Sequence, residues 1–259
     1  MAIPEPVRVL ALYPFRELPV PPDIEVFELE GARLGVNGWP TAQVVQPVDG
    51  GPADVRATVE EARSIARSRR KTTLAWWVAP ADDHLVAPLE ALGLENRDTP
   101  GLETVENAMA LVDPPPPTAE DVEVRMVETW EDYRAGAEVG RAAFGMPEIA
   151  EELLRERFES YSRPDNPGRG FVALVDGRVV GNAFAAGGDV GVNLFGGAVI
   201  EEARGRGVYR SLLRARWDFA VARGTPALTV QAGRMSKPIC ERSGFVFVAA
   251  ARVFVDEIA

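Results

Sequence analysis

Four consecutive prolines, Pro114 to Pro117, lie near the middle of this 259-residue chain and constrain its fold more than any other feature. Proline fixes φ and lacks a backbone N–H, so such a run favours a stiff extended segment rather than the interior of a helix or sheet. Residues 107–112 before it and 122–127 after it are typical of strands. The sequence therefore predicts two units, residues 1–113 and 119–259, joined by a linker at 114–118.

Composition excludes several classes of protein. Apolar residues make up 46% of the chain, yet no stretch approaches the ~20 apolar residues of a membrane span, and the N-terminus lacks a signal peptide's pattern. The net charge of -11 argues against a nucleic-acid binder. One cysteine, Cys240, and one histidine, His84, leave no set for a disulfide or a Cys/His metal site. We expect a cytoplasmic protein with no metal, nucleic acid or membrane as a partner.

The second unit has the pattern of a mixed α/β sheet. Asp176-Gly177 is typical of a type I′ hairpin turn, and Gly224 is placed to end a helix. The expected strands are 122–127, 171–175, 178–184, 191–200, 227–231 and 245–255, and the expected helices are 129–144, 147–161, 208–222 and 236–243.

The first unit has weaker signals. They predict strands at 7–12, 72–78 and 104–112 and helices at 53–70 and 82–92. Its tail, a strand from Leu74 and a helix ending near Gly93, parallels a strand from Leu228 and a helix ending at Gly244. We therefore expect an internal repeat whose first copy is degenerate.

A loop rich in arginine and glycine joins strand 191–200 to helix 208–222. Residues 203–216 hold five arginines and no acid. Glycine permits a tight turn and a close approach of a ligand, and the helix directs unpaired N–H groups and its positive dipole end at the same place. This pattern predicts an anion site, in particular for phosphate. The equivalent loop of the first unit, residues 47–52, has no arginine, and Asp49 and Asp54 would repel an anion.

These features together resemble the GNAT superfamily, the GCN5-related N-acetyltransferases. Arg204-Gly-Arg-Gly207-Val-Tyr209 matches the family pattern Arg/Gln-x-x-Gly-x-Gly/Ala except at its last position. The resemblance implies tandem GNAT-like folds, the first degenerate, and an acetyltransferase that moves an acetyl group from acetyl-CoA to a small-molecule or protein amine. It implies that the cofactor contacts Ala198, Val199, Ile200, Arg204, Gly205, Arg206, Gly207, Val208, Tyr209 and Arg210.

The catalytic residues are harder to assign. Many family members use a tyrosine as acid at the position that Cys240 occupies here. A thiol is a poor acid for this purpose, and a free cysteine also commonly fills core space. Asn193 is a second candidate, as a ligand of substrate or water or as a satisfied buried amide. Arg214 and Arg216 are expected on a solvated helix face.

An alternative interpretation is a non-catalytic acyl-CoA-binding or interaction protein that retains the phosphate loop. A third interpretation is a transferase that uses a longer acyl donor than acetyl-CoA. The family places the acceptor near residues 144–161 and the loop 163–170. The sequence leaves the acceptor, the acyl chain length and the oligomeric state open.

Overall fold

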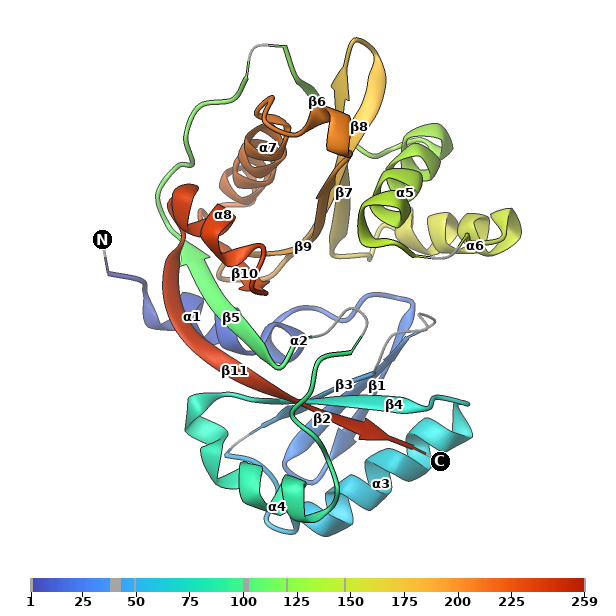
Figure 1. Ribbon diagram of the computed structural model, residues 1–259, viewed down its shortest axis with the longest axis vertical. Helices are drawn as coiled ribbons and strands as arrows, with labels where there is room; N and C mark the ends of the chain where they lie inside the picture. Colours follow the sequence, from blue (N-terminus) through green and yellow to red (C-terminus); the bar gives the residue numbers. More distant parts are fainter. Residues whose placement is uncertain are drawn as a thin grey trace.

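The strands of the chain form one continuous mixed sheet. The computed structural model describes residues 2–37, 43–48, 50–99, 103–119, 121–146 and 148–258. The strand order is β1-β2-β3-β4-β11-β5-β10-β9-β8-β7-β6 (Figure 1). The bounds are β1 Ile24–Leu29, β2 Ala32–Asn37, β3 Gln43–Pro47, β4 Thr73–Val78, β5 Val105–Leu111, β6 Glu123–Met126, β7 Gly168–Val175, β8 Arg178–Gly187, β9 Val192–Val199, β10 Leu228–Ala232 and β11 Val246–Glu257.

Helices cover both faces of this sheet. The α-helices are α1 Glu5–Leu12, α2 Pro14–Glu17, α3 Val55–Ser68, α4 Val86–Ala91, α5 Trp130–Phe144, α6 Glu151–Tyr161, α7 Val208–Ala222 and α8 Lys237–Arg242, with 3-10 turns η1 Pro80–Leu85 and η2 Glu201–Ala203. In the second unit, α7 lies on one face of β7 to β9, and α5 and α6 lie on the other (Figure 1). Within the described part of the chain, no helix is long and apolar enough to cross a bilayer.

The local signals of the second unit are confirmed. Asp176 and Gly177 have φ of 51° and 76°, as the turn between β7 and β8 requires. Thr129 caps α5 by accepting a hydrogen bond from the Asp132 N–H. Helix α6 begins at Glu151, later than predicted, and residue 147 lies outside the described residues.

The predicted strand at residues 7–12 is wrong, because this segment is helix α1. Pro6 lies in its first turn, where a missing N–H costs little. Val7, Leu10 and Ala11 have helical spacing and are buried, and Val7 and Ala11 pack on Ala108 of β5. The short apolar run therefore has the period of a helix.

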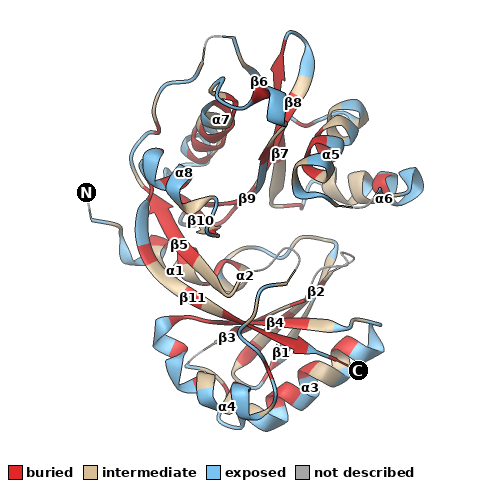
Figure 2. Ribbon diagram, in the orientation of Figure 1, coloured by how far each residue is buried: buried red, intermediate tan, exposed pale blue. Residues whose placement is uncertain are grey.

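The predicted internal repeat is present as two β–α–β units. In the first, β3 pairs in parallel with β4, with Gln43 opposite Leu74, and α3 connects them. In the second, β9 pairs in parallel with β10, with Val192 opposite Leu228, and α7 connects them. Each copy has its own core, one around α3 and one around α7, whose inward faces are buried (Figure 2).

The last strands of the two units are exchanged. Strand β11, at the end of the second unit, pairs with β4 and β5, while β5 pairs with β11 and β10. The sheet therefore continues without a break from one unit to the other. The division into domains at residues 114–118 stays a prediction.

Candidate functional site

The two parallel strands of the second repeat separate part-way along their length. Strand β10 pairs with β9 only from Leu228 opposite Val192 to Val230 opposite Leu194, whereas β9 continues to Val199. From Phe195 onward, the edge of β9 that faces β10 has no partner strand in this pairing. Backbone N–H and C=O groups on such an edge are available to an extended ligand.

A bulge formed by two glycines lies where the strands separate. The register of β8 and β9 shifts between Asn182 and Phe184, so that β9 gains a residue around Gly196 and Gly197. A Cβ on Gly196 would face Phe184, at 3.6 Å, whereas a Cβ on Gly197 would lie 3.2 Å from Tyr209 on the other side. Both glycines are exposed. Bare backbone is thus accessible at a point that connects the two faces of the sheet.

The start of α7 is open as the arginine–glycine loop predicts. Gly205 and Gly207 have φ of 80° and 82°, in the left-handed region that favours glycine. Gly207 is the N-cap and supplies no side-chain acceptor. The Ser211 N–H donates to the Gly207 carbonyl at 3.0 Å, and the N–H groups of the turn before Ser211 have no acceptor within the helix. Such a terminus fits a phosphate.

The five arginines of this segment have different environments. Arg204, Arg206 and Arg210 are exposed around the loop. Arg206 pairs with Asp121 at 2.8 Å, and this partner lowers the pKa of the Asp121 carboxyl. Arg214 pairs with Asp218 on the surface, as expected.

Arg216 contradicts the sequence expectation, because it is buried rather than on a solvated helix face. Its exposed fraction is 1%. Its Nε donates to the Leu212 carbonyl at 3.1 Å, but Nη2 has no hydrogen-bond partner in the described structure. Burial lowers the pKa of this guanidinium. Its helical neighbours Leu212, Leu213 and Ala220 are buried, so Arg216 lies on the apolar face of α7, and this spacing was the available signal.

Cys240 and Tyr209 lie together beside this arginine. The Tyr209 hydroxyl is 4.0 Å from Cys240 Sγ, and the Arg216 guanidinium carbon is 5.9 Å from the centre of the Tyr209 ring. Burial raises the pKa of the Cys240 thiol, and it raises the pKa of Tyr209 to about 12. Both groups are therefore neutral at physiological pH.

Asn193 lies at the opposite face of the sheet. Its side chain is fully buried, and its Oδ1 accepts a hydrogen bond from the Thr229 hydroxyl at 2.7 Å. Its Nδ2 is 3.5 Å from Gln231 Oε1, and Gln231 in turn donates to the Ala11 carbonyl. These contacts satisfy the amide, and a catalytic role for Asn193 stays a prediction.

The predicted cofactor residues of β9 follow the same edge. Ala198 is buried, whereas Val199 and Ile200 are half-buried next to the loop. The Ile200 N–H donates to the Val180 carbonyl of β8 at 2.9 Å, which holds the end of β9 in place. The strand, the loop and the start of α7 thus form one continuous surface.

A cavity of about 470 Å³ lies on the α5 face of the sheet, between the two units. This volume is in the range of small-molecule sites. Its apolar lining includes Phe15, Leu18 and Ile24 from the first unit and Tyr133, Phe184 and Phe195 from the second. Gly196 also lines it, so the cavity reaches the bulge of β9. The sequence did not predict this cavity, because more than a third of its lining residues lie in 14–35, where no site was expected.

Asn182 is a polar group in the wall of this cavity. It is 4% exposed, and its Oδ1 has no hydrogen-bond partner in the described structure. Its amide lies against Gly136 and Gly140 of α5, where a Cβ on Gly140 would be 3.2 Å from Nδ2. An asparagine within the apolar run of β8, together with two helix glycines four residues apart, was the available signal for this site.

Among the residues that the structure describes, no group of three or more His, Cys, Asp or Glu side chains could hold a metal ion. The arrangement can instead hold an anion at α7, an extended chain along β9 and an apolar molecule in the cavity.

Solved structures with the same fold were found. A GCN5-related N-acetyltransferase from Kribbella flavida has a TM-score of 0.68 and 16% identity, covering 98% of this chain and 96% of that one. A tandem GNAT protein from the clavulanic acid biosynthesis pathway, determined without AcCoA, has a TM-score of 0.64 and 18% identity, covering 100% and 90%.

A GCN5-related N-acetyltransferase from Sphaerobacter thermophilus has a TM-score of 0.64 and 18% identity, covering 88% of this chain and 77% of that one. No protein-family model and no curated protein matches the sequence. The two β–α–β repeats, the parted strands of the second and the agreement in fold over most of the chain lead to one conclusion: this chain has the tandem fold of the GNAT superfamily.

Proposed function

We propose that this chain is an acetyl-CoA-dependent N-acetyltransferase whose acceptor is a small amine with an apolar body. The observation that carries the proposal is the meeting of two sites at the Gly196–Gly197 bulge. The surface of β9 and α7 approaches it from one face, and the apolar cavity reaches it from the other. A donor and an acceptor held in these two sites would meet beside the two glycines, where no side chain separates them.

The donor side fits CoA. The open start of α7 and the side chains of Arg204, Arg206 and Arg210 would hold its phosphates. The pantetheine arm would pair with β9 from Ile200 toward the bulge. Residues 196–200 at the end of β9 span ~13 Å, and the extended arm would pair along this length. The thioester would then lie at Gly196 and Gly197.

The acceptor side favours an apolar molecule. Apart from its aromatic and aliphatic lining, the cavity is bordered by one acid, Asp23, and by Arg33, Arg141 and Arg157. A mostly apolar lining disfavours an ammonium ion, and only the neutral amine is a nucleophile. The unpartnered Asn182 Oδ1 would accept a hydrogen bond from the amine. Because the cavity is closed in by both units, we favour a small molecule over a protein amine.

A second candidate is a CoA-binding protein without turnover. The observation that favours it is the buried, neutral thiol of Cys240 where related enzymes have an acid. The two candidates share the donor site and differ in whether acetyl-CoA is consumed.

The test incubates the protein with acetyl-CoA and a panel of amines and measures free CoA thiol over time. The panel contrasts arylalkylamines and branched alkylamines with ethanolamine, a polar aminoglycoside and a lysine peptide. Faster release with the apolar amines supports the proposal. CoA binding without turnover on any amine favours the second candidate, and absence of CoA binding contradicts both.

A cavity-filling variant tests the acceptor site. Ala137 lines the cavity on α5, whereas Ala142 is exposed on the same helix. We expect Ala137→Phe to raise the KM for the amine at least tenfold without changing CoA affinity. Ala142→Phe is the matched control and should leave both values unchanged. Equal kinetics of the two variants would place the acceptor elsewhere.

A further inference from the structure

Arg216 is a buried cation without a counterion. No ion pair involving this side chain is found among the described residues, and its Nη2 has no hydrogen-bond partner. A guanidinium removed from water is costly unless an anion and hydrogen bonds compensate. A residue of this kind indicates that an anion reaches it from outside the chain.

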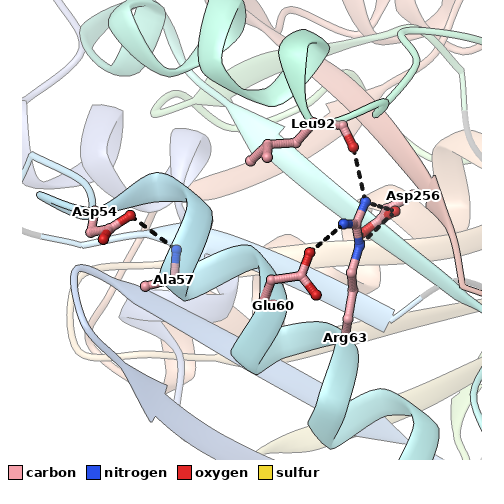
Figure 3. A network of polar contacts seen from close by, with 6 residues as sticks. All are labelled: Asp54, Ala57, Glu60, Arg63, Leu92 and Asp256. Carbon is pink, nitrogen blue, oxygen red and sulfur yellow. Dashed lines mark hydrogen bonds and ion pairs between the residues drawn. The ribbon is translucent and has the colours of Figure 1, made fainter.

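The first repeat contains the corresponding arginine together with its anion. Arg63 follows the first residue of α3, Val55, by the same interval at which Arg216 follows the first residue of α7, Val208. Arg63 pairs with Asp256 at 2.8 Å and with Glu60 at 2.8 Å, and donates to the Leu92 carbonyl at 3.1 Å (Figure 3).

The exchange of strands explains why this anion is absent in the second repeat. Asp256 of β11 lies opposite Leu74 of β4. In the second repeat, Leu228 of β10 corresponds to Leu74, and the residue opposite it on β5 is Leu111. A buried leucine thus stands where the first repeat has the carboxylate that neutralises its arginine.

The groups that face the Arg216 guanidinium are neutral. Tyr209 from its own helix and Cys240 from α8 both have raised pKa values because of burial. From β9 it faces Gly197, where a Cβ would lie 3.9 Å from both terminal nitrogens. The Glu241 carboxylate acts on the neighbouring Cys240, whose pKa its charge raises further.

We propose that Arg216 binds the thiolate sulfur of CoA when the acetyl group leaves. This inference rests on the proposed function, which places the thioester at Gly196 and Gly197. The amine nitrogen forms a bond to the acetyl carbon, the C–S bond breaks, and its electron pair remains on sulfur. The amine loses one proton to solvent, so that the products are the amide, a thiolate and a proton. Arg216 stabilises that thiolate, and the Tyr209 hydroxyl donates a hydrogen bond beside it.

Phosphate does not fit this position as well as sulfur does. Arg216 follows the first residue of α7 by about 12 Å along the helix, because each residue rises about 1.5 Å. The proposed phosphate site is at the start of α7, about 12 Å from Arg216 along the helix. The arm along β9 would end near Gly197. The guanidinium therefore meets the sulfur end of the ligand.

The test compares the affinity of CoA with that of desulfo-CoA, in which hydrogen replaces the thiol, by calorimetry from pH 6 to pH 9. We expect the wild type to bind CoA at least tenfold more tightly than desulfo-CoA at pH 9, with a smaller preference at pH 6. The pKa of the bound thiol, followed by the ultraviolet absorbance of the thiolate, should lie below that of free CoA.

Arg216→Met should abolish this preference and restore an ordinary thiol pKa, while Arg216→Lys should retain part of both. Desulfo-CoA affinity should be the same in all three proteins, which also shows that the variants are folded. Equal binding of CoA and desulfo-CoA by the wild type, or an unchanged preference in Arg216→Met, would overturn the inference while leaving the proposed function intact. Failure of both ligands to bind would overturn the proposed function and the inference with it.

Discussion

The two helices that follow the third and ninth strands begin in opposite ways. At α3, the Asp54 side chain accepts the Ala57 N–H at 3.0 Å, and Glu30 accepts the Ala53 N–H at 3.1 Å (Figure 3 shows the first of these). At α7, the N-cap is Gly207 and offers no acceptor. The first helix start is closed by carboxylates of the chain itself, whereas the second has no side-chain cap.

The same difference recurs deeper in each helix. Arg63 has Asp256 as an internal anion, whereas Arg216 has none in the described structure. At both positions the first repeat supplies its own carboxylate, and the described part of the second repeat does not. The comparison therefore supports the proposal that the donor site lies in the second unit.

The largest expected effect tests the internal ion pair of the first repeat. Arg63→Met leaves Asp256, which is 2% exposed, as a buried charge without its main partner, and should lower the free energy of unfolding by about 3 kcal/mol. Arg216→Met removes an unpaired charge, so it should leave the free energy of unfolding unchanged or raise it. Urea denaturation of both variants measures this difference in the free energy of unfolding. Equal destabilisation of the two variants would contradict the expected difference between the two arginines.

Closing the open helix start should abolish ligand binding. Gly207→Asp places a carboxylate at the N-cap of α7, as in α3, and should weaken CoA binding at least ~100-fold through repulsion of phosphate. Gly207→Asn has nearly the same shape and the same backbone strain at φ 82°. The aspartate variant should bind at least ~10-fold more weakly than the asparagine variant. Similar affinities would show that shape rather than charge matters there.

Each of the two exchanged strands carries an acid. Asp256 on β11 is buried and Glu106 on β5 is half-buried. Asp256 on β11 has Arg63, whereas burial and the charge of Glu103 raise the pKa of Glu106 on β5 to about 7. Below pH ~4.5 both the folded and unfolded states hold this proton. Between pH ~4.5 and 7 only the folded state holds it, so stability decreases as pH rises.

Glu106→Gln should therefore raise the free energy of unfolding by about 1–3 kcal/mol at pH 8 and by little at pH 4. Denaturant unfolding at the two pH values measures this. An equal gain at both would show that the effect is unrelated to the proton.

Reversing a charge in the loop should have a moderate effect. Arg204→Glu replaces an exposed arginine beside the phosphate site and should weaken CoA binding at least ~10-fold. Arg56→Glu makes the same change on an exposed position in the first turn of α3 and should have no effect. Calorimetry measures the CoA affinity of both variants. Weaker CoA binding by Arg56→Glu would indicate that the phosphates bind at the first repeat instead of the second.

The smallest effect concerns the acid that pairs with the loop. Asp121→Asn frees Arg206 and should strengthen CoA binding by about two- to fourfold, because exposed pairs are weak. Asp165→Asn removes another exposed partner, that of Arg163, and should leave binding unchanged. Weaker binding in Asp121→Asn would show that Asp121 orients Arg206 rather than competing for it.

Local signals were sufficient for much of the second unit. Asp176-Gly177 fixed its hairpin, and the glycines of the loop and the following helix were recognisable without tertiary information. The segment 7–12 was misread because a short apolar run has no decisive period, and proline at a helix start was the better guide. Strands β1 to β3 had no distinct signal.

Features that depend on distant parts of the chain were not predictable. The exchange of β5 and β11 depends on pairing over more than a hundred residues. The surroundings of Arg216 include Tyr209 of its own helix and Cys240 of α8, which is distant in sequence. The cavity needs residues 14–35 to lie against α5. In each case the local sequence permits several partners, and packing selects one.

The stoichiometry of CoA binding tests the central claim most directly. Calorimetry with the full chain should give one CoA per chain, lost in Gly207→Asp and unchanged when Asp54→Ala removes the cap of α3. Two CoA molecules per chain, or one that survives Gly207→Asp, would contradict the assignment of the donor site to the second repeat.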